Sequence, residues 1–132
     1  MRNLVLGAIV AVASFAQTAA PPKQFFFIRI EPTRPTFTED ATKEENKILA
    51  EHFNYLKKLT QEGTVVLAGP SINGSKTFGV IIVEVANEAD AKAILAGDPA
   101  YKAGIWKGEV APFQVAMQRD AKPAKVLDLP SK

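Results

Sequence analysis

The chain has 132 residues, with 16 lysines and arginines against 14 aspartates and glutamates, and its net charge of +2 is too weakly basic to indicate a nucleic-acid-binding protein. It contains no cysteine, which excludes disulfides, thiol catalysis and a lipid-modified cysteine. His52 is the only histidine, and no carboxylate cluster invites a metal ion, so we expect neither a metal nor an organic cofactor.

The first residues have the order of a secretory signal peptide. Arg2 supplies a positive charge, residues 4–13 (LVLGAIVAVA) are apolar, and small residues follow at Ser14 and Ala16. The apolar run is about half of the roughly 20 residues that a membrane-spanning helix needs. We therefore expect a signal peptide at 1–16 (to about residue 20), cleaved after Ala16, and a mature protein that is periplasmic or secreted and not attached to the membrane. The alternative is an apolar helix that is retained and packs.

Strand and helix patterns alternate along the rest of the chain. The aromatic and β-branched run KQFFFIRIE predicts a strand that stops at Pro32. Thr42 and Glu45 form the T-x-x-E pattern of a capping box, which predicts the start of a helix. The expected elements are a strand at 23–31, a loop at 32–40, a helix at 43–61, a strand at 64–67, a turn at Asn73-Gly74, a strand at 78–85, a helix at 88–96, a strand within 105–117 and a mobile tail at 118–132.

This order is β-α-β-β-α-β, which predicts one α+β domain at 23–117 with a ferredoxin-like fold. In that fold, two helices cover one face of a four-stranded antiparallel sheet and leave the other face uncovered. In the first strand, Phe25 and Phe27 point away from Phe26 and Ile28, so both faces look apolar. Strands that are apolar on both faces are normally buried on both faces, so we expect a homodimer in which two sheets pack face to face. A monomer with an exposed apolar sheet is the alternative.

His52 is the first candidate for chemistry. On the predicted helix, Ile48, Leu56 and Leu59 lie within about 40° of it, so it falls in the middle of the apolar stripe. An imidazole turned toward a core loses hydration and needs a partner. It either satisfies a backbone carbonyl and has a structural role, or it lines a small pocket and acts as a base, an acid or a nucleophile.

Asp98 is the second candidate, in the sequence Gly97-Asp98-Pro99 after a helix end. An aspartate at such a place often caps the turn that follows, here residues 100–103. If it reaches the imidazole instead, it would fix the tautomer and raise the basicity of the other ring nitrogen.

Four further residues are weaker candidates for a substrate pocket. Arg34 would place a positive charge near the pocket mouth for an anionic substrate, or would simply be solvated. Gly69 and Pro70 would shape the pocket wall rather than react. Tyr101 would supply a hydroxyl, or would form an ordinary edge of the core.

Several segments together resemble the YciI-like (YCII-related) family. They are HFNYLKKLTQEGTVVLAGP at 52–70, GVII at 79–82 and DPAYKAG at 98–104, and RPTF at 34–37 resembles exported or longer members. The resemblance covers roughly 23–117. It implies a dimeric α/β-barrel assembly and an active site whose histidine and aspartate match His52 and Asp98. It also implies structural similarity to muconolactone-isomerase-like proteins, with lyase or dehalogenating activity on small ring compounds.

The leading hypothesis is therefore a small exported enzyme. His52 would act as general acid or base and Asp98 would orient it, in an isomerisation or elimination on a small, cyclic or anionic molecule. A phosphorylated histidine is a less favoured variant of this hypothesis. The alternatives are a protein that binds a small ligand without turnover and a structural dimer.

Overall fold

The computed structural model describes residues 19–120, so the expected signal peptide at 1–16 and all but the first three residues of the expected tail at 118–132 lie outside the described residues. The helices and strands are, in chain order, β1 (Gln24–Pro32), α1 (Phe37–Asp40), α2 (Lys43–Gln61), β2 (Val65–Ser71), β3 (Phe78–Val85), α3 (Glu88–Gly97), α4 (Pro99–Lys102) and β4 (Trp106–Pro112).

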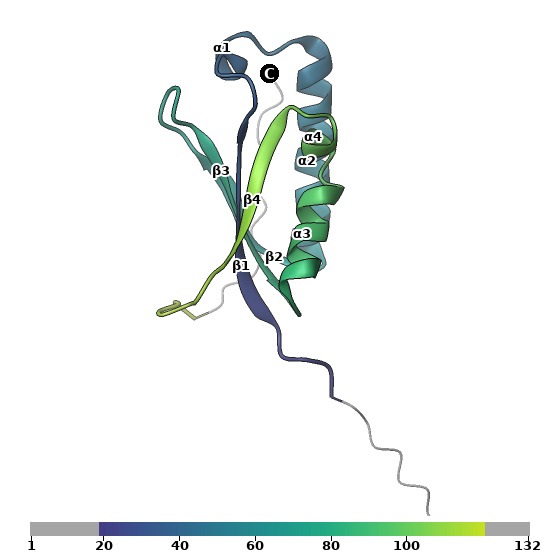
Figure 1. Cartoon of the computed structure of the whole chain (residues 1–132), viewed down its shortest axis with the longest axis vertical. Helices are drawn as coiled ribbons and strands as arrows, with labels where there is room; N and C mark the ends of the chain where they lie inside the picture. The colour runs from purple at the N-terminus through teal and green to yellow at the C-terminus, as the bar shows by residue number, and fades with distance from the viewer. Residues whose placement is uncertain (1–18, 121–132) are drawn as a thin grey trace, which may run out of the picture.

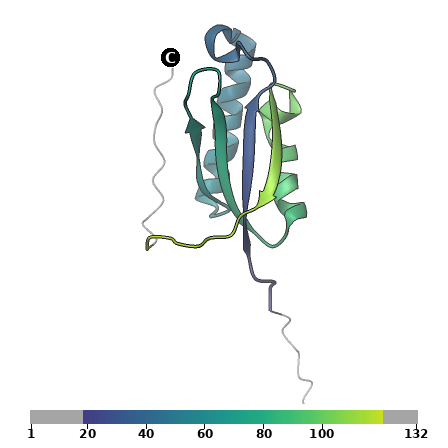
Figure 2. The ribbon, with the colours of Figure 1, turned by 60° about the vertical axis from the view of Figure 1, so that its left-hand side comes forward.

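The four strands form one antiparallel sheet in the order β2-β3-β1-β4. The helices α2, α3 and α4 lie on one face of this sheet, and the described part of the chain leaves the other face open (Figure 1, Figure 2). The predicted ferredoxin-like fold is thereby confirmed, with α1 and α4 added as short helices. Within residues 19–120, no helix is both long and apolar enough to cross a membrane.

The hydrophobic core lies between the sheet and the helices. Alternate residues of β1 are buried, as the period of two in a strand requires, with Phe26 3% and Ile28 0% exposed. The strand β3 contributes Ile81 and Val83 in the same way. The buried members of the core are Phe26, Ile28, Ile30, Val65, Ile81, Val83, Ala91 and Leu95.

The helix α2 begins and ends where its local sequence predicts. The Glu45 amide donates to Thr42 Oγ1 (3.1 Å) and the Thr42 amide donates to Glu45 Oε2 (2.8 Å), which completes the capping box. Gly63, just beyond the helix, has φ +81°, a conformation that glycine adopts at little cost. The position of His52 along this helix is therefore fixed by strong local signals at both ends.

The strand β2 is longer than predicted. Gly69 and Pro70, expected to close it, lie within it and pair with Val80 and Gly79 of β3. The reason is that β2 is an edge strand, so one of its sides has no neighbouring strand. A proline has no amide hydrogen, and on that side no backbone hydrogen bond of the sheet is lost.

The open face of the sheet is apolar over only part of its area, which corrects the expectation of two apolar faces. One row across the sheet, Leu67, Ile82, Phe27 and Ala111, is apolar. Nearer the loop at 33–36, the same face carries charged side chains. Arg29 donates to Glu31 Oε2 (2.9 Å), and Lys107 Nζ lies 3.1 Å from Glu31 Oε1. The charged residues on this side of the apolar row are Arg29, Glu31, Lys107 and Glu109, whereas Glu84 lies beyond the other side of the row, opposite Phe25.

Candidate active site

The structure brings His52 and Asp98 together. His52 lies in the middle of α2, and Asp98 lies in the break between α3 and α4, 46 positions later in the chain. His52 Nδ1 is 2.6 Å from Asp98 Oδ2. The Asp98 side chain is 2% exposed and that of His52 is 15% exposed, so this contact is shielded from water. Shielding strengthens a hydrogen bond between an imidazole and a carboxylate.

Asp98 also caps α4, so the two alternatives for this residue hold together. Its Oδ1 accepts hydrogen bonds from the amides of Ala100 (2.8 Å) and Tyr101 (3.4 Å), while Oδ2 contacts His52. Pro99 follows as the first residue of α4, and its missing amide hydrogen costs nothing there. A carboxylate held at both oxygens has little freedom to turn, so Asp98 can set the orientation of the imidazole.

The contact with Asp98 determines which ring nitrogen of His52 is available. A carboxylate oxygen can only accept, so Nδ1 carries the hydrogen and donates to it. In the neutral imidazole, the lone pair is then on Nε2. Within residues 19–120, Nε2 has no hydrogen-bond partner and is not fully enclosed by protein atoms. An imidazole held in this tautomer can take a proton at Nε2.

Aromatic side chains lie beside the imidazole. The centroid of the Trp106 ring is 6.1 Å from that of His52, and the Phe37 ring is 5.2 Å from Trp106. Phe37 is 4% exposed, and the need to bury it explains why α1 forms in a segment expected to be a loop. Among the described residues, Trp106 Nε1 is the one buried side-chain nitrogen or oxygen without a hydrogen-bond partner. A buried unpaired donor is costly unless a water or a ligand accepts from it.

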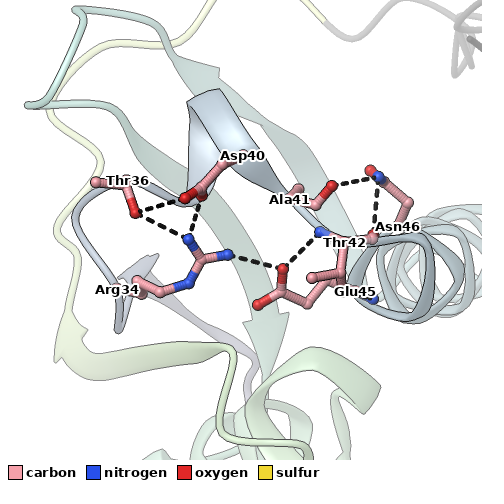
Figure 3. Close-up of polar contacts among 7 residues, drawn as sticks. All are labelled: Arg34, Thr36, Asp40, Ala41, Thr42, Glu45 and Asn46. Carbon is pink, nitrogen blue, oxygen red and sulfur yellow. Dashed lines mark hydrogen bonds and ion pairs between the residues drawn. The ribbon is translucent and has the colours of Figure 1, made fainter.

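Arg34 does not present a free positive charge. Its guanidinium pairs with Asp40 and with Glu45 (2.8 Å) and donates to Thr36 Oγ1 (2.8 Å), as Figure 3 shows. These contacts raise the pKa of Arg34 and, together with the capping hydrogen bonds at Glu45, lower the pKa of both carboxylates. The expected cation at a pocket mouth is instead a link between the loop at 33–36 and the first turn of α2.

The other weak candidates make no hydrogen bond to the imidazole of His52 in the described part of the chain. Gly69 and Pro70 lie on β2, at the edge of the sheet opposite to β4, which carries Trp106. Tyr101 meets Asp98 through its backbone amide, and its side chain is exposed. Tyr55 is a further residue of this region that no sequence pattern indicates. It lies one turn after His52 on α2, and burial and the charge of Asp98 raise its pKa.

The larger of the described cavities lies on the open face of the sheet, away from the His52–Asp98 pair. It measures about 590 Å³ and lies between the hairpin at 71–78 and the loop at 32–38. Arg29, Glu31 and Lys107 line it from the sheet. Within residues 19–120, no three histidine, aspartate or glutamate side chains are grouped as metal ligands.

Comparison with known proteins agrees with this fold. The YCII-related domain family matches residues 26–114. A solved structure of 5-chloro-2-hydroxyhydroquinone dehydrochlorinase from Burkholderia phenoliruptrix AC1100, in complex with 2,5-dihydroxybenzoquinone, is similar with a TM-score of 0.54. The two chains are 19% identical, over 68% of this chain and 93% of the other, which shows a common fold. No curated protein matches the sequence significantly. Because the family match runs from β1 to the residues just after β4, this chain belongs to the YCII-related domain family.

Proposed function

We propose that the protein is an enzyme that uses His52 as a general acid or base and Asp98 as the group that orients it. The observation that carries this proposal is the 2.6 Å contact from His52 Nδ1 to a carboxylate that is 2% exposed, with Nε2 left free. Catalysis by His52 needs a second ring nitrogen that is not already paired, and Nε2 meets this condition among the described residues.

The reaction class is elimination or isomerisation. His52 Nε2 removes a proton from a carbon or hydroxyl of the substrate, and the electron pair left behind either expels a leaving group or shifts a double bond. The imidazolium that forms is stabilised by the Asp98 carboxylate at 2.6 Å. The same nitrogen then returns the proton, to another substrate atom in an isomerisation or to solvent in an elimination.

The substrate class is a small ring compound that carries oxygen substituents. The ring of Trp106, which is partly exposed, lies beside His52 and is suited to contact a planar ligand ring. The structural neighbour is by its name a dehydrochlorinase of a chlorinated hydroxyhydroquinone, which makes an elimination of this kind the first reaction to test.

Export and dimerisation complete the proposal. The signal-peptide pattern at 1–16 supports a periplasmic or secreted protein that begins near Gln17. The row through Leu67, which is 62% exposed, supports a homodimer that packs sheet against sheet. Mass spectrometry of the secreted N-terminus tests the first statement, and light scattering of residues 17–132 tests the second.

The test of catalysis is the rate of chloride release from 5-chloro-2-hydroxyhydroquinone by the wild type, His52→Gln and Glu51→Gln. Glu51 is an exposed neighbour on α2, so its variant is a matched control for a glutamine at this point of the helix. We expect at least a hundredfold loss with His52→Gln, because general acid–base catalysis contributes about 10²–10⁴-fold, and no loss with Glu51→Gln. Equal rates in all three proteins would refute the role of His52.

Ligand binding without turnover is the second candidate, and the open-face cavity favours it. That cavity is within the range of about 300–1,000 Å³ typical of ligand sites, but neither His52 nor Asp98 lines it. The two functions differ in one measurement. If 2,5-dihydroxybenzoquinone binds equally to the wild type and to His52→Gln, and neither protein turns over substrate, binding is the function.

A further inference from the structure

Tyr55 connects α2 to the segment that carries Asp98. It follows His52 by one turn of α2, so both side chains lie on the same side of the helix. The Tyr55 hydroxyl donates a hydrogen bond to the carbonyl oxygen of Ile94 at 2.9 Å. That carbonyl is in the last turn of α3, four residues before Asp98.

The Ile94 carbonyl is available because α3 tightens as it ends. In a continuing α-helix, the Asp98 amide would donate to Ile94, four residues earlier. Instead, the Asp98 amide donates to the Leu95 carbonyl at 3.2 Å. The Tyr55 hydroxyl takes the place of the missing helical donor, so the hydrogen bond is specific to this helix end.

Gly97 makes room for the Tyr55 side chain. A Cβ atom at position 97 would lie 2.7 Å from the Tyr55 hydroxyl oxygen and 3.4 Å from Cζ. The phenol therefore lies directly against the residue that precedes Asp98. Burial, as the larger cause, and the negative charge of Asp98, as the smaller one, raise the pKa of Tyr55. The hydroxyl therefore keeps its proton and remains a hydrogen-bond donor at neutral pH.

We propose that Tyr55 is a positioning residue, which sets the distance between the Asp98 carboxylate and the His52 imidazole. α2 thus holds the α3–α4 junction at two points, through His52 at Asp98 and through Tyr55 at Ile94. Without the second point, the junction can rotate about the first. The consequence for catalysis rests on the proposed function, whereas the geometry of the pair can be measured without any substrate.

The chain has two tyrosines, which provides a matched control. Tyr55→Phe removes a hydroxyl that makes a hydrogen bond, and Tyr101→Phe removes the hydroxyl of an exposed side chain. The readout is the NMR signal of the His52 Nδ1 proton, which is unambiguous because there is one histidine. A short hydrogen bond to a carboxylate moves this signal far downfield and protects it from exchange with water.

We expect Tyr55→Phe to move the Nδ1 proton signal upfield or broaden it, and Tyr101→Phe to leave it unchanged. Gly97→Ala keeps the hydroxyl but displaces it, and should also move the signal, which guards against a folding defect peculiar to one variant. The turnover rate should fall roughly tenfold in Tyr55→Phe with KM little changed, since even small misplacements of catalytic groups are costly.

An unchanged Nδ1 signal in both Tyr55→Phe and Gly97→Ala would overturn the proposal. If these variants change the Nδ1 signal but the wild type turns over no substrate, Tyr55 still positions the pair and only the catalytic function is refuted. The two proposals can therefore fail separately.

Discussion

Replacing Asp98 by asparagine should preserve the fold and reverse the tautomer of His52. The amide oxygen of asparagine can take over both hydrogen bonds that Oδ1 receives from the α4 amides. The amide nitrogen then occupies the place of Oδ2, 2.6 Å from His52 Nδ1 in the wild type. Because NH₂ is a donor, Nδ1 has to become the acceptor, and the imidazole hydrogen moves to Nε2. The opposite orientation would turn the NH₂ group toward two backbone donors and is excluded.

The free energies separate this variant from Asp98→Ala. In Asp98→Asn, a charge-assisted hydrogen bond of about 1.5–3 kcal/mol is replaced by a neutral one of about 0.5–1.5 kcal/mol, a loss of roughly 1–2 kcal/mol. Asp98→Ala loses that bond entirely and also the helix cap, which contributes about 0.5–2 kcal/mol. The alanine variant should therefore be less stable than the asparagine variant by roughly 1–3 kcal/mol.

Long-range ¹H–¹⁵N spectra of the single imidazole identify the tautomer, and urea unfolding followed by circular dichroism gives the stabilities. We expect hydrogen on Nδ1 in the wild type and on Nε2 in Asp98→Asn, together with loss of the basic nitrogen and of turnover. If Asp98→Asn keeps the hydrogen on Nδ1, or if the alanine and asparagine variants are equally stable, the hydrogen-bond assignments at Asp98 are wrong.

Two further predictions concern packing and pH. Gly108→Ala would place a methyl group 3.0 Å from Leu95 Cδ1 and 2.8 Å from a backbone carbonyl oxygen of β1. This crowding should lower the free energy of unfolding, measured in urea, by about 1–3 kcal/mol. Gly69→Ala is the control, because its methyl group would meet no atom within 4 Å and should leave the stability nearly unchanged. The hydrogen bond from the Thr42 amide and, second, the contact with Arg34 lower the pKa of Glu45. The contribution of these contacts to stability should be complete above pH 4.5 and fade as the pH falls below it. The difference in stability between the wild type and Arg34→Gln, which removes the second contact, should therefore shrink in acid; a difference that does not change with pH would contradict this.

The parts of the fold that follow from local signals could be predicted from the sequence. The capping residues of α2 lie within four positions of one another, and the alternation along β1 depends only on neighbouring residues. The bounds of α2 and β3 accordingly match the predicted ranges. The extension of β2 through Pro70 could not be foreseen in this way, because it depends on β2 being at the edge of the sheet.

The candidate site is different, because its residues come from separate elements. The sequence predicts that His52 lies on the apolar stripe of a helix and that Asp98 lies at a helix cap. A separation of 46 positions along the chain, however, does not indicate how far apart the two side chains lie in space. The two interpretations of Asp98 seemed exclusive only because the carboxylate was treated as one acceptor, while its oxygens serve different partners. Tyr55 was missed because its partner is a backbone carbonyl, which no sequence pattern displays.

The tripeptide Gly97-Asp98-Pro99 shows how the site depends on a break between helices. Pro99 disfavours helical backbone in the residue before it, and Asp98 accordingly has φ −66° and ψ 126°, an extended conformation. That conformation ends α3 and makes Asp98 the N-cap of α4, with one carboxylate oxygen left over for the imidazole. Gly97 leaves the space that Tyr55 occupies. If α3 continued into α4, the carboxylate would follow the helix instead of capping it, and His52 would lose its partner although neither residue of the pair had changed. The chemistry of the pair is therefore encoded as much in the two residues that flank Asp98 as in the pair itself.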